Sequence, residues 1–220
     1  MTSPNPPAFP SEPSSFKLKG PDGMIECLAD LPEADVARSG CVVLCHPHPQ
    51  HGGTMRNKVV TILERSCREL GLKTVRFNFR GVGESEGQFD EGVGEAEDLR
   101  TVIRWVQSVC PDDALWLGGF SFGAFISIQV ASEFPIKQLL SIAPPAGRYG
   151  MDTLDTPNCP WLVVQGDEDE VVSAEAVKQW ATALSPPPEF VMMEGAGHFF
   201  HRRLMDLRGL IKNHVQNNLP

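Results

Sequence analysis

Residues 119–123 read Gly-Phe-Ser-Phe-Gly and hold the serine best placed to act as a nucleophile. The segment follows an apolar stretch typical of a strand and precedes a pattern typical of a helix, so the chain must turn sharply at Ser121. Glycine on both sides lets the neighbouring backbone approach such a turn closely. This strand–turn–helix sequence raises a serine Oγ above the carboxyl end of a sheet. We therefore expect Ser121 to be a nucleophile rather than an ordinary turn residue.

A serine nucleophile requires a general base, and three histidines follow Ser121 in the chain. His201 and His214 belong to the pattern of the last helix, where a solvent-exposed histidine is the ordinary case. His198 lies instead in a glycine-rich loop that leaves the last strand at the same end of the sheet as Ser121. We expect His198 to be the base.

The base needs a carboxylate that orients it, and residues 167–170 offer four acidic side chains directly after an apolar strand. Most acidic runs of this kind are simply solvent-exposed loops. One member need only reach Nδ1 of His198 to hold the correct tautomer. Asp169 lies a few residues past the strand end, where a loop can curl back. The pattern favours Asp169, with Asp167 as the alternative.

A tetrahedral intermediate at Ser121 would also need hydrogen-bond donors for its oxyanion. The backbone N–H of Phe122, at the start of the helix, is the first expected donor. The second should come from the loop after the first core strand, residues 46–53. Prolines at positions 47 and 49 have no N–H, which leaves His48 or Gln50 as the donor.

The same loop contains three histidines within six residues, His46, His48 and His51, and this raises a metal site as an alternative. No cysteine pair or carboxylate accompanies them at the spacing of metal ligands, and the two prolines stiffen the loop. We therefore expect no metal, and the proposed chemistry requires no organic cofactor.

The elements that must position these residues alternate between strand and helix patterns. Apolar runs predict core strands at 41–45, 73–79, 115–118, 136–143, 161–165 and 189–193, and helical spacing predicts helices at 59–70, 99–109, 122–133, 174–184 and 204–215. Such alternation requires crossover connections, so we predict an α/β fold with a mostly parallel central sheet flanked by helices.

The N-terminal part of the chain carries different signals. Residues 1–15 hold five prolines and four serines and predict a flexible or surface-hugging tail. Two short strands at 16–19 and 24–28, joined by Gly-Pro-Asp-Gly, predict a hairpin at the sheet edge. We expect a single catalytic domain over residues 16–220, because nothing beyond the tail marks a second domain.

Composition limits the partners of this 220-residue chain. Hydrophobic residues make up 41% and charged residues 21%, as in a globular protein. The net charge of −9, with scattered basic residues, disfavours nucleic acid or an anionic membrane as partner. No apolar run reaches the roughly 18 residues of a membrane span. Six cysteines without a C-x-x-C pair and a start unlike a signal peptide predict reduced thiols and a cytoplasmic location.

Five sequence blocks in order resemble the α/β-hydrolase superfamily over residues 16–220. They are His-Pro-His-Pro at 46–49 followed by Gly-Gly at 52–53, Arg-Phe-Asn-Phe-Arg-Gly-Val-Gly at 76–83, Gly-Phe-Ser-Phe-Gly at 119–123, Gly-x-x-Asp at 166–169, and Gly-His at 197–198. Within it, the chain is similar to small lidless serine hydrolases related to dienelactone hydrolases, with serine in place of their cysteine. The resemblance implies the α/β-hydrolase fold and a triad of Ser121, Asp169 and His198.

The segment that usually carries a lid in this superfamily is short here. Only seventeen residues, 144–160, separate two predicted strands, which is too few for a helical cap. We therefore expect an open site and a carboxylesterase that cleaves small short-acyl esters. Alternatives are a peptidase, thioesterase, acyltransferase or lyase that uses the same residues, or a non-catalytic ligand-binding protein on this fold. Phe122, Phe199 and Phe200 flank the predicted site and are candidates for the acyl pocket, although the core is their default location.

Overall fold

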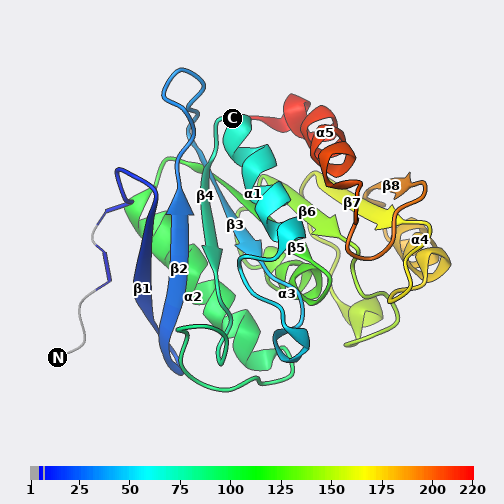
Figure 1. Cartoon of the computed structure of the whole chain (residues 1–220), viewed down its shortest axis with the longest axis horizontal. Coiled ribbons are helices and arrows are strands. Elements are labelled where there is room, and N and C mark those ends of the chain that lie inside the picture. Colours follow the sequence, from blue (N-terminus) through cyan, green and yellow to red (C-terminus); the bar gives the residue numbers. More distant parts are fainter. Residues whose placement is uncertain (1–4, 7) are drawn as a thin grey trace.

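A computed structural model describes residues 5–6 and 8–220, and these form one sheet with helices on both faces (Figure 1). The strands are β1 (Ser14–Gly20), β2 (Gly23–Asp30), β3 (Gly40–Cys45), β4 (Lys73–Phe77), β5 (Ala114–Phe120), β6 (Gln138–Ile142), β7 (Trp161–Gly166) and β8 (Glu189–Met193). Their spatial order is β1-β2-β4-β3-β5-β6-β7-β8. The pairs of β1 with β2 and of β2 with β4 are antiparallel, and all other pairs are parallel. The predicted mostly parallel sheet and edge hairpin are therefore confirmed.

The helices cover the two faces of the sheet unequally. They are α1 (Lys58–Glu69), α2 (Val93–Val109), α3 (Phe122–Ala131), α4 (Ala174–Ala183) and α5 (Leu204–Val215), with short 3₁₀ helices η1 (Pro49–His51), η2 (Met151–Thr153) and η3 (Gln216–Asn218). Buried side chains of α1 and α5 pack on one face, and those of α2, α3 and α4 pack on the other. In Figure 1, α1 and α5 lie in front of the sheet and α2 and α3 behind it.

Strand β3 illustrates how the central strands are buried on both faces. All six of its residues are buried. Cys41, Val43 and Cys45 face the layer of α2 and α3, whereas Val42 and Leu44 face the layer of α1 and α5. A strand with apolar contacts on both sides must be apolar throughout, which is why its sequence shows no alternation. All six cysteines of the chain are free thiols.

Two predicted boundaries differ from the structure for local reasons. Strand β4 ends at Phe77 rather than at residue 79, because Asn78 turns to neighbouring loops: its Oδ1 accepts from the N–H of Met55 at 2.8 Å. Helix α2 begins six residues before the predicted residue 99. The Glu95 carboxylate accepts from the N–H of Gly92 at 2.7 Å and thereby caps this earlier start.

The described part of the predicted N-terminal tail lies against α2. Residues 1–4 and 7 of that prediction lie outside the described residues. The indole N–H of Trp105 donates to the carbonyl of Pro6 at 2.9 Å, and the ring of Phe9 stacks on the indole at 5.9 Å between centroids. Strand β1 starts at Ser14, so the last residues of this segment already belong to the sheet.

The connection between β6 and β7 carries no cap over the sheet. Its only regular element among the described residues is η2, one 3₁₀ turn at Met151–Thr153. Among the helices of residues 5–6 and 8–220, none is both long enough and apolar enough to span a bilayer.

Candidate active site

Ser121 lies in a tight turn that only glycine neighbours allow. The turn joins β5 to α3, and Ser121 takes a strained backbone conformation with φ 54° and ψ −119°. A Cβ atom on Gly119 would approach the carbonyl oxygen of Gly123 to 2.2 Å, and one on Gly123 would approach that of Cys45 to 2.4 Å. Both glycines are therefore required by the close packing of α3 on β5 and β3, as the Gly-x-Ser-x-Gly pattern predicts.

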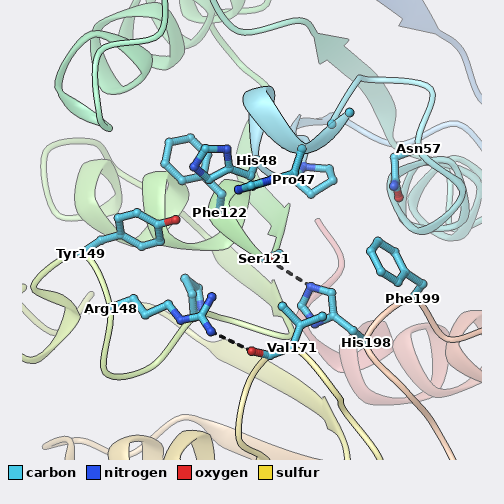
Figure 2. A pocket seen from close by; sticks show the side chains of 14 residues that line it. Pro47, His48, Asn57, Ser121, Phe122, Arg148, Tyr149, Val171, His198 and Phe199 are labelled. Atoms are coloured by element: carbon cyan, nitrogen blue, oxygen red, sulfur yellow. Dashed lines mark hydrogen bonds between the residues drawn. The ribbon is translucent and has the colours of Figure 1, made fainter.

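The loop after β8 brings His198 to Ser121. His198 Nε2 lies 3.1 Å from Ser121 Oγ (Figure 2). Its Nδ1 lies 2.8 Å from Asp169 Oδ2. The backbone N–H of His198 donates to Glu170 at 3.0 Å, which ties this loop to the one after β7. His198 is only 3% exposed. The structure thus joins residues from three separate loops into one hydrogen-bonded chain.

Asp169 sits in a nest of donors that holds its carboxylate in place. Oδ1 accepts from the N–H groups of Val171 at 2.8 Å and Val172 at 2.7 Å, and Oδ2 accepts from Gln165 Nε2 at 2.8 Å besides the imidazole. Burial by itself raises the pKa of this carboxyl. The hydrogen bond from His198 and those from the backbone outweigh it, so that the pKa of Asp169 is lowered. The side chain is therefore an anion that faces the imidazole.

The alternative carboxylate, Asp167, has a different partner. Its Oδ1 accepts from the N–H of Gly195 at 2.7 Å and does not contact the imidazole. The other two histidines considered as bases also lie elsewhere. His201 is exposed in the turn before α5, and His214 pairs with Glu189 on the surface. Of the histidines after Ser121, only His198 contacts it.

The two expected sources of the second oxyanion donor are distinguished by their hydrogen bonds. The N–H of Gln50 donates to Nδ1 of His48 at 3.2 Å, and Gln50 does not line the cavity at Ser121. His48 lines that cavity, and its own N–H has no acceptor among the described residues. Phe122 begins α3, where the backbone N–H has no partner within the helix. Phe122 and His48 thus both line the cavity beside Ser121, and their backbone N–H groups have no acceptor among the described residues.

His46 has a structural part that the sequence pattern did not reveal. Its Nδ1 lies 2.6 Å from the carbonyl of Pro47, and its Nε2 accepts from the N–H of Phe79 at 3.0 Å. Burial lowers the pKa of His46 to about 4, so the ring is neutral and ties together the loops after β3 and β4. With both nitrogens engaged it is not available to a metal. Within residues 5–6 and 8–220, no group of three histidine, cysteine or acidic side chains is arranged to hold a metal ion.

A cavity of about 380 Å³ opens beside Ser121. It is lined by Pro47, His48, His51, Gly52, Gly53, Asn57, Ser121, Phe122, Pro145, Arg148, Tyr149, Val171, His198 and Phe199 (Figure 2). Burial, and then repulsion from His51, lower the pKa of His48, which favours a neutral ring at this wall. Phe122 and Phe199 line the cavity as anticipated, whereas Phe200 is fully buried in the core.

Sequence reasoning missed the cavity residues supplied by the β6–β7 connection, Arg148 and Tyr149. The signal that could have found them is their position. Both lie in the loop that leaves a predicted parallel strand at the carboxyl edge, next to the expected nucleophile. A cation and an aromatic side chain between two glycines in such a loop are candidates for substrate contact.

Comparisons with known proteins agree with this geometry. Residues 38–216 match the family described as an alpha/beta hydrolase domain. A serine hydrolase without a lid from Xanthomonas campestris is 48% identical, with a TM-score of 0.94 over 98% of this chain and 99% of its own. A serine hydrolase homologue from Coxiella burnetii is 50% identical, with a TM-score of 0.90 over 94% and 99%. An uncharacterised protein from Rickettsia prowazekii is 35% identical over 90% of this chain and 87% of its own.

Proposed function

The chain belongs to the alpha/beta hydrolase family, as a serine hydrolase without a lid, and from that premise we propose that it is a carboxylesterase for small esters. One observation carries the proposal. An unbroken hydrogen-bonded chain runs from Ser121 Oγ through His198 to the buried Asp169, and Ser121 and His198 line the cavity. This arrangement supplies a nucleophile, a base and an orienting anion in the order that acyl transfer requires.

The first half of the proposed reaction forms an acyl-enzyme. Asp169 holds the Nδ1–H tautomer of His198, which leaves Nε2 free to accept the proton of Ser121. The serine Oγ attacks the ester carbonyl, and the imidazolium that results is stabilised by the Asp169 anion. The proton then passes to the leaving alcohol as the ester C–O bond breaks. In the second half, water loses a proton to His198 and attacks the acyl carbon. The bond between the acyl carbon and Ser121 Oγ then breaks, Oγ regains the proton from His198, and the acid is released.

The negative charge of each tetrahedral intermediate needs fixed donors. The N–H groups of Phe122 and His48 are the proposed pair, because neither has an acceptor among the described residues and both residues line the cavity. The Phe122 N–H also lies at the positive end of the α3 dipole, which favours an oxyanion. Donors that are already in place lower the barrier without a cost of reorganisation during the reaction.

The cavity argues for a small substrate. Its volume of about 380 Å³ lies near the lower end of ligand sites, which span roughly 300–1,000 Å³. Aromatic rings of His48, Phe122, Tyr149 and Phe199 form much of its wall. The connection between β6 and β7 adds only a single 3₁₀ turn, so no lid must move before a substrate enters. Short acyl esters fit this volume and wall better than long-chain lipids.

The test is the turnover of p-nitrophenyl esters with acyl chains of two to twelve carbons, together with labelling by a fluorophosphonate. We expect the activity to peak at short chains and to fall by about 10⁴–10⁶-fold in Ser121→Ala. Ser132→Ala, which alters an exposed serine at the end of α3, is the matched control and should keep both activity and labelling.

Two results would contradict the proposal in different ways. Labelling at Ser121 without ester turnover would retain the nucleophile and point to peptidase, thioesterase or acyltransferase chemistry. Absence of both labelling and turnover in the folded wild-type protein would make a ligand-binding function the better explanation.

A further inference from the structure

Arg148 is the one permanently charged side chain that lines the cavity at Ser121, as far as the described residues go. No aspartate or glutamate is among the lining residues. Asp169 lies behind the imidazole with a side chain that is 0% exposed, so its charge does not reach the cavity surface directly. The protein as a whole carries a net charge of −9. The wall of this cavity carries one cation and no carboxylate, so its charge is opposite in sign to that of the whole protein.

Arg148 is exposed, and one nitrogen of its guanidinium has a hydrogen-bond partner in the protein. Its Nη2 donates to the carbonyl of Val171 at 2.8 Å (Figure 2). Among the described residues, Nε and Nη1 have no acceptor and the side chain has no ion-pair partner. The backbone is held as well, since its N–H donates to Pro145 and its carbonyl accepts from Met151, both at 3.1 Å. A guanidinium with one N–H hydrogen-bonded to the protein and others without an acceptor can bind a planar anion such as a carboxylate.

Tyr149 extends this part of the wall. Its ring stacks on Phe125 at 5.1 Å between centroids and meets the edge of Phe122 at 5.5 Å. Figure 2 shows its hydroxyl directed toward the cavity, on the same side of Ser121 as Arg148. His198 and Phe199 lie on the opposite side of the serine in that view. A hydroxyl and a guanidinium therefore share one side of the cavity, and the catalytic imidazole lies on the other.

The positions of His198 and Arg148 on opposite sides of Ser121 indicate where the alcohol and acyl parts of a bound ester would lie. The leaving alcohol must lie on the side of His198, because the imidazolium protonates its oxygen. The acyl group then extends to the side of Tyr149 and Arg148. We propose that the substrates are hemiesters of short dicarboxylic acids, whose free carboxylate binds Arg148 while the ester carbonyl lies at Ser121. This inference rests on the proposed esterase function and adds its substrate class.

The chemistry of such a substrate needs no other reactant than water. Ser121 Oγ bonds to the ester carbon, the alcohol leaves with the proton from His198, and the free carboxylate stays on Arg148 as an anion. Water, which loses a proton to His198, then attacks the acyl carbon. The bond to Ser121 Oγ breaks, Oγ regains the proton, and the dicarboxylic acid leaves the enzyme. The carboxylate on Arg148 takes part in neither bond change, so its contribution is to bind and orient the acyl group.

The test compares monoethyl succinate with ethyl butyrate, which share the leaving group and differ in the terminal carboxylate. Hydrolysis is followed by pH-stat titration in the wild type, Arg148→Gln, Arg148→Lys and Arg104→Gln. We expect Arg148→Gln to lower the ratio of kcat/KM for the anionic over the neutral ester by about 10–100-fold, mainly through KM. The ratio for Arg148→Lys should lie between those of the wild type and Arg148→Gln, because lysine keeps the charge without the planar guanidinium. Arg104→Gln removes the same charge from the exposed surface of α2 and should keep the wild-type ratio.

Each other result has a definite meaning. A merely structural effect of Arg148, through the loop of Val171 and Asp169, would lower both rates equally and leave the ratio unchanged, which would overturn the proposal. Acetoxyacetate, with its carboxylate on the alcohol, provides a further comparison. If Arg148→Gln impaired hydrolysis of acetoxyacetate and not of monoethyl succinate, the acyl-side assignment would be wrong. Absence of Ser121-dependent turnover of any neutral ester would instead reject the esterase function itself.

Discussion

Replacement of Asp169 by asparagine tests the proposed mechanism most directly, because the neighbours of this side chain fix how an amide must sit. The two backbone N–H groups of Val171 and Val172 point at Oδ1, so the amide oxygen must take that place. The amide nitrogen then replaces Oδ2 and faces His198 Nδ1 and Gln165 Nε2, each at 2.8 Å. In the reversed orientation, the amide nitrogen would face both backbone N–H donors, which is energetically less favourable.

An amide N–H at this place stabilises the wrong tautomer of His198. Nδ1 must become an acceptor, so the ring proton moves to Nε2, which can no longer take the proton of Ser121. The active tautomer loses one charge-assisted hydrogen bond and gains a contact between two donors. Each of these two changes costs about 1.5–3 kcal/mol, so the active tautomer is destabilised by about 3–6 kcal/mol, or roughly 10²–10⁴-fold in rate. Loss of the anion that stabilises the imidazolium places the expected decrease of kcat at the upper end, about 10³–10⁴-fold.

The assay is the initial rate on a short p-nitrophenyl ester, with circular dichroism to verify that each variant is folded. Asp167→Asn is the matched control. Its amide oxygen can still accept from the N–H of Gly195, so we expect activity within a few-fold of wild type. A folded Asp169→Asn that kept more than a tenth of the wild-type kcat would refute the tautomer argument. If Asp167→Asn lost activity instead, the orienting role would move to Asp167.

Two further predictions concern the loop after β3. The φ of His48 is −49°, which proline can adopt, so His48→Pro should remove the backbone donor together with the imidazole and lower kcat by about 10²–10³-fold. His48→Ala retains the N–H and should lose far less activity; equal losses in the two variants would argue against an oxyanion role. The pKa of His46 falls from 6.5 to about 4 on folding, so the unfolded chain binds the proton more readily. The neutral His46 therefore stabilises the folded protein above pH 6.5. As the pH falls toward 4, the free energy of unfolding should decrease by about 3 kcal/mol. Urea titrations should show this slope in the wild type and a flatter one in His46→Gln, and identical slopes would refute the assignment.

The sequence by itself determined the order of the elements and the position of the turn that holds the proposed nucleophile. Apolar runs such as Cys41–Cys45 indicate strands buried on both faces, and helical spacing between them implies crossovers and a parallel sheet. The Gly-x-Ser-x-Gly pattern was informative because its glycines are imposed by contacts of its own turn, close to 2 Å for any added Cβ. Such local constraints leave a mark at fixed spacing, which is why the tight turn at Ser121 could be predicted without a structure.

Tertiary structure decided what depends on separate loops meeting. The sequence favoured Asp169 but left Asp167 as an alternative, and only the packing of the β7 and β8 loops gives Asp167 to Gly195 and Asp169 to His198. The same holds for His48 and Gln50, which differ in whether their N–H is already bonded. Arg148 was not singled out from the sequence, because its place in the cavity results from the β6–β7 connection meeting Val171. Contacts of this kind join residues far apart in the chain, so no sequence period records them, and only the folded arrangement assigns each side chain its partner.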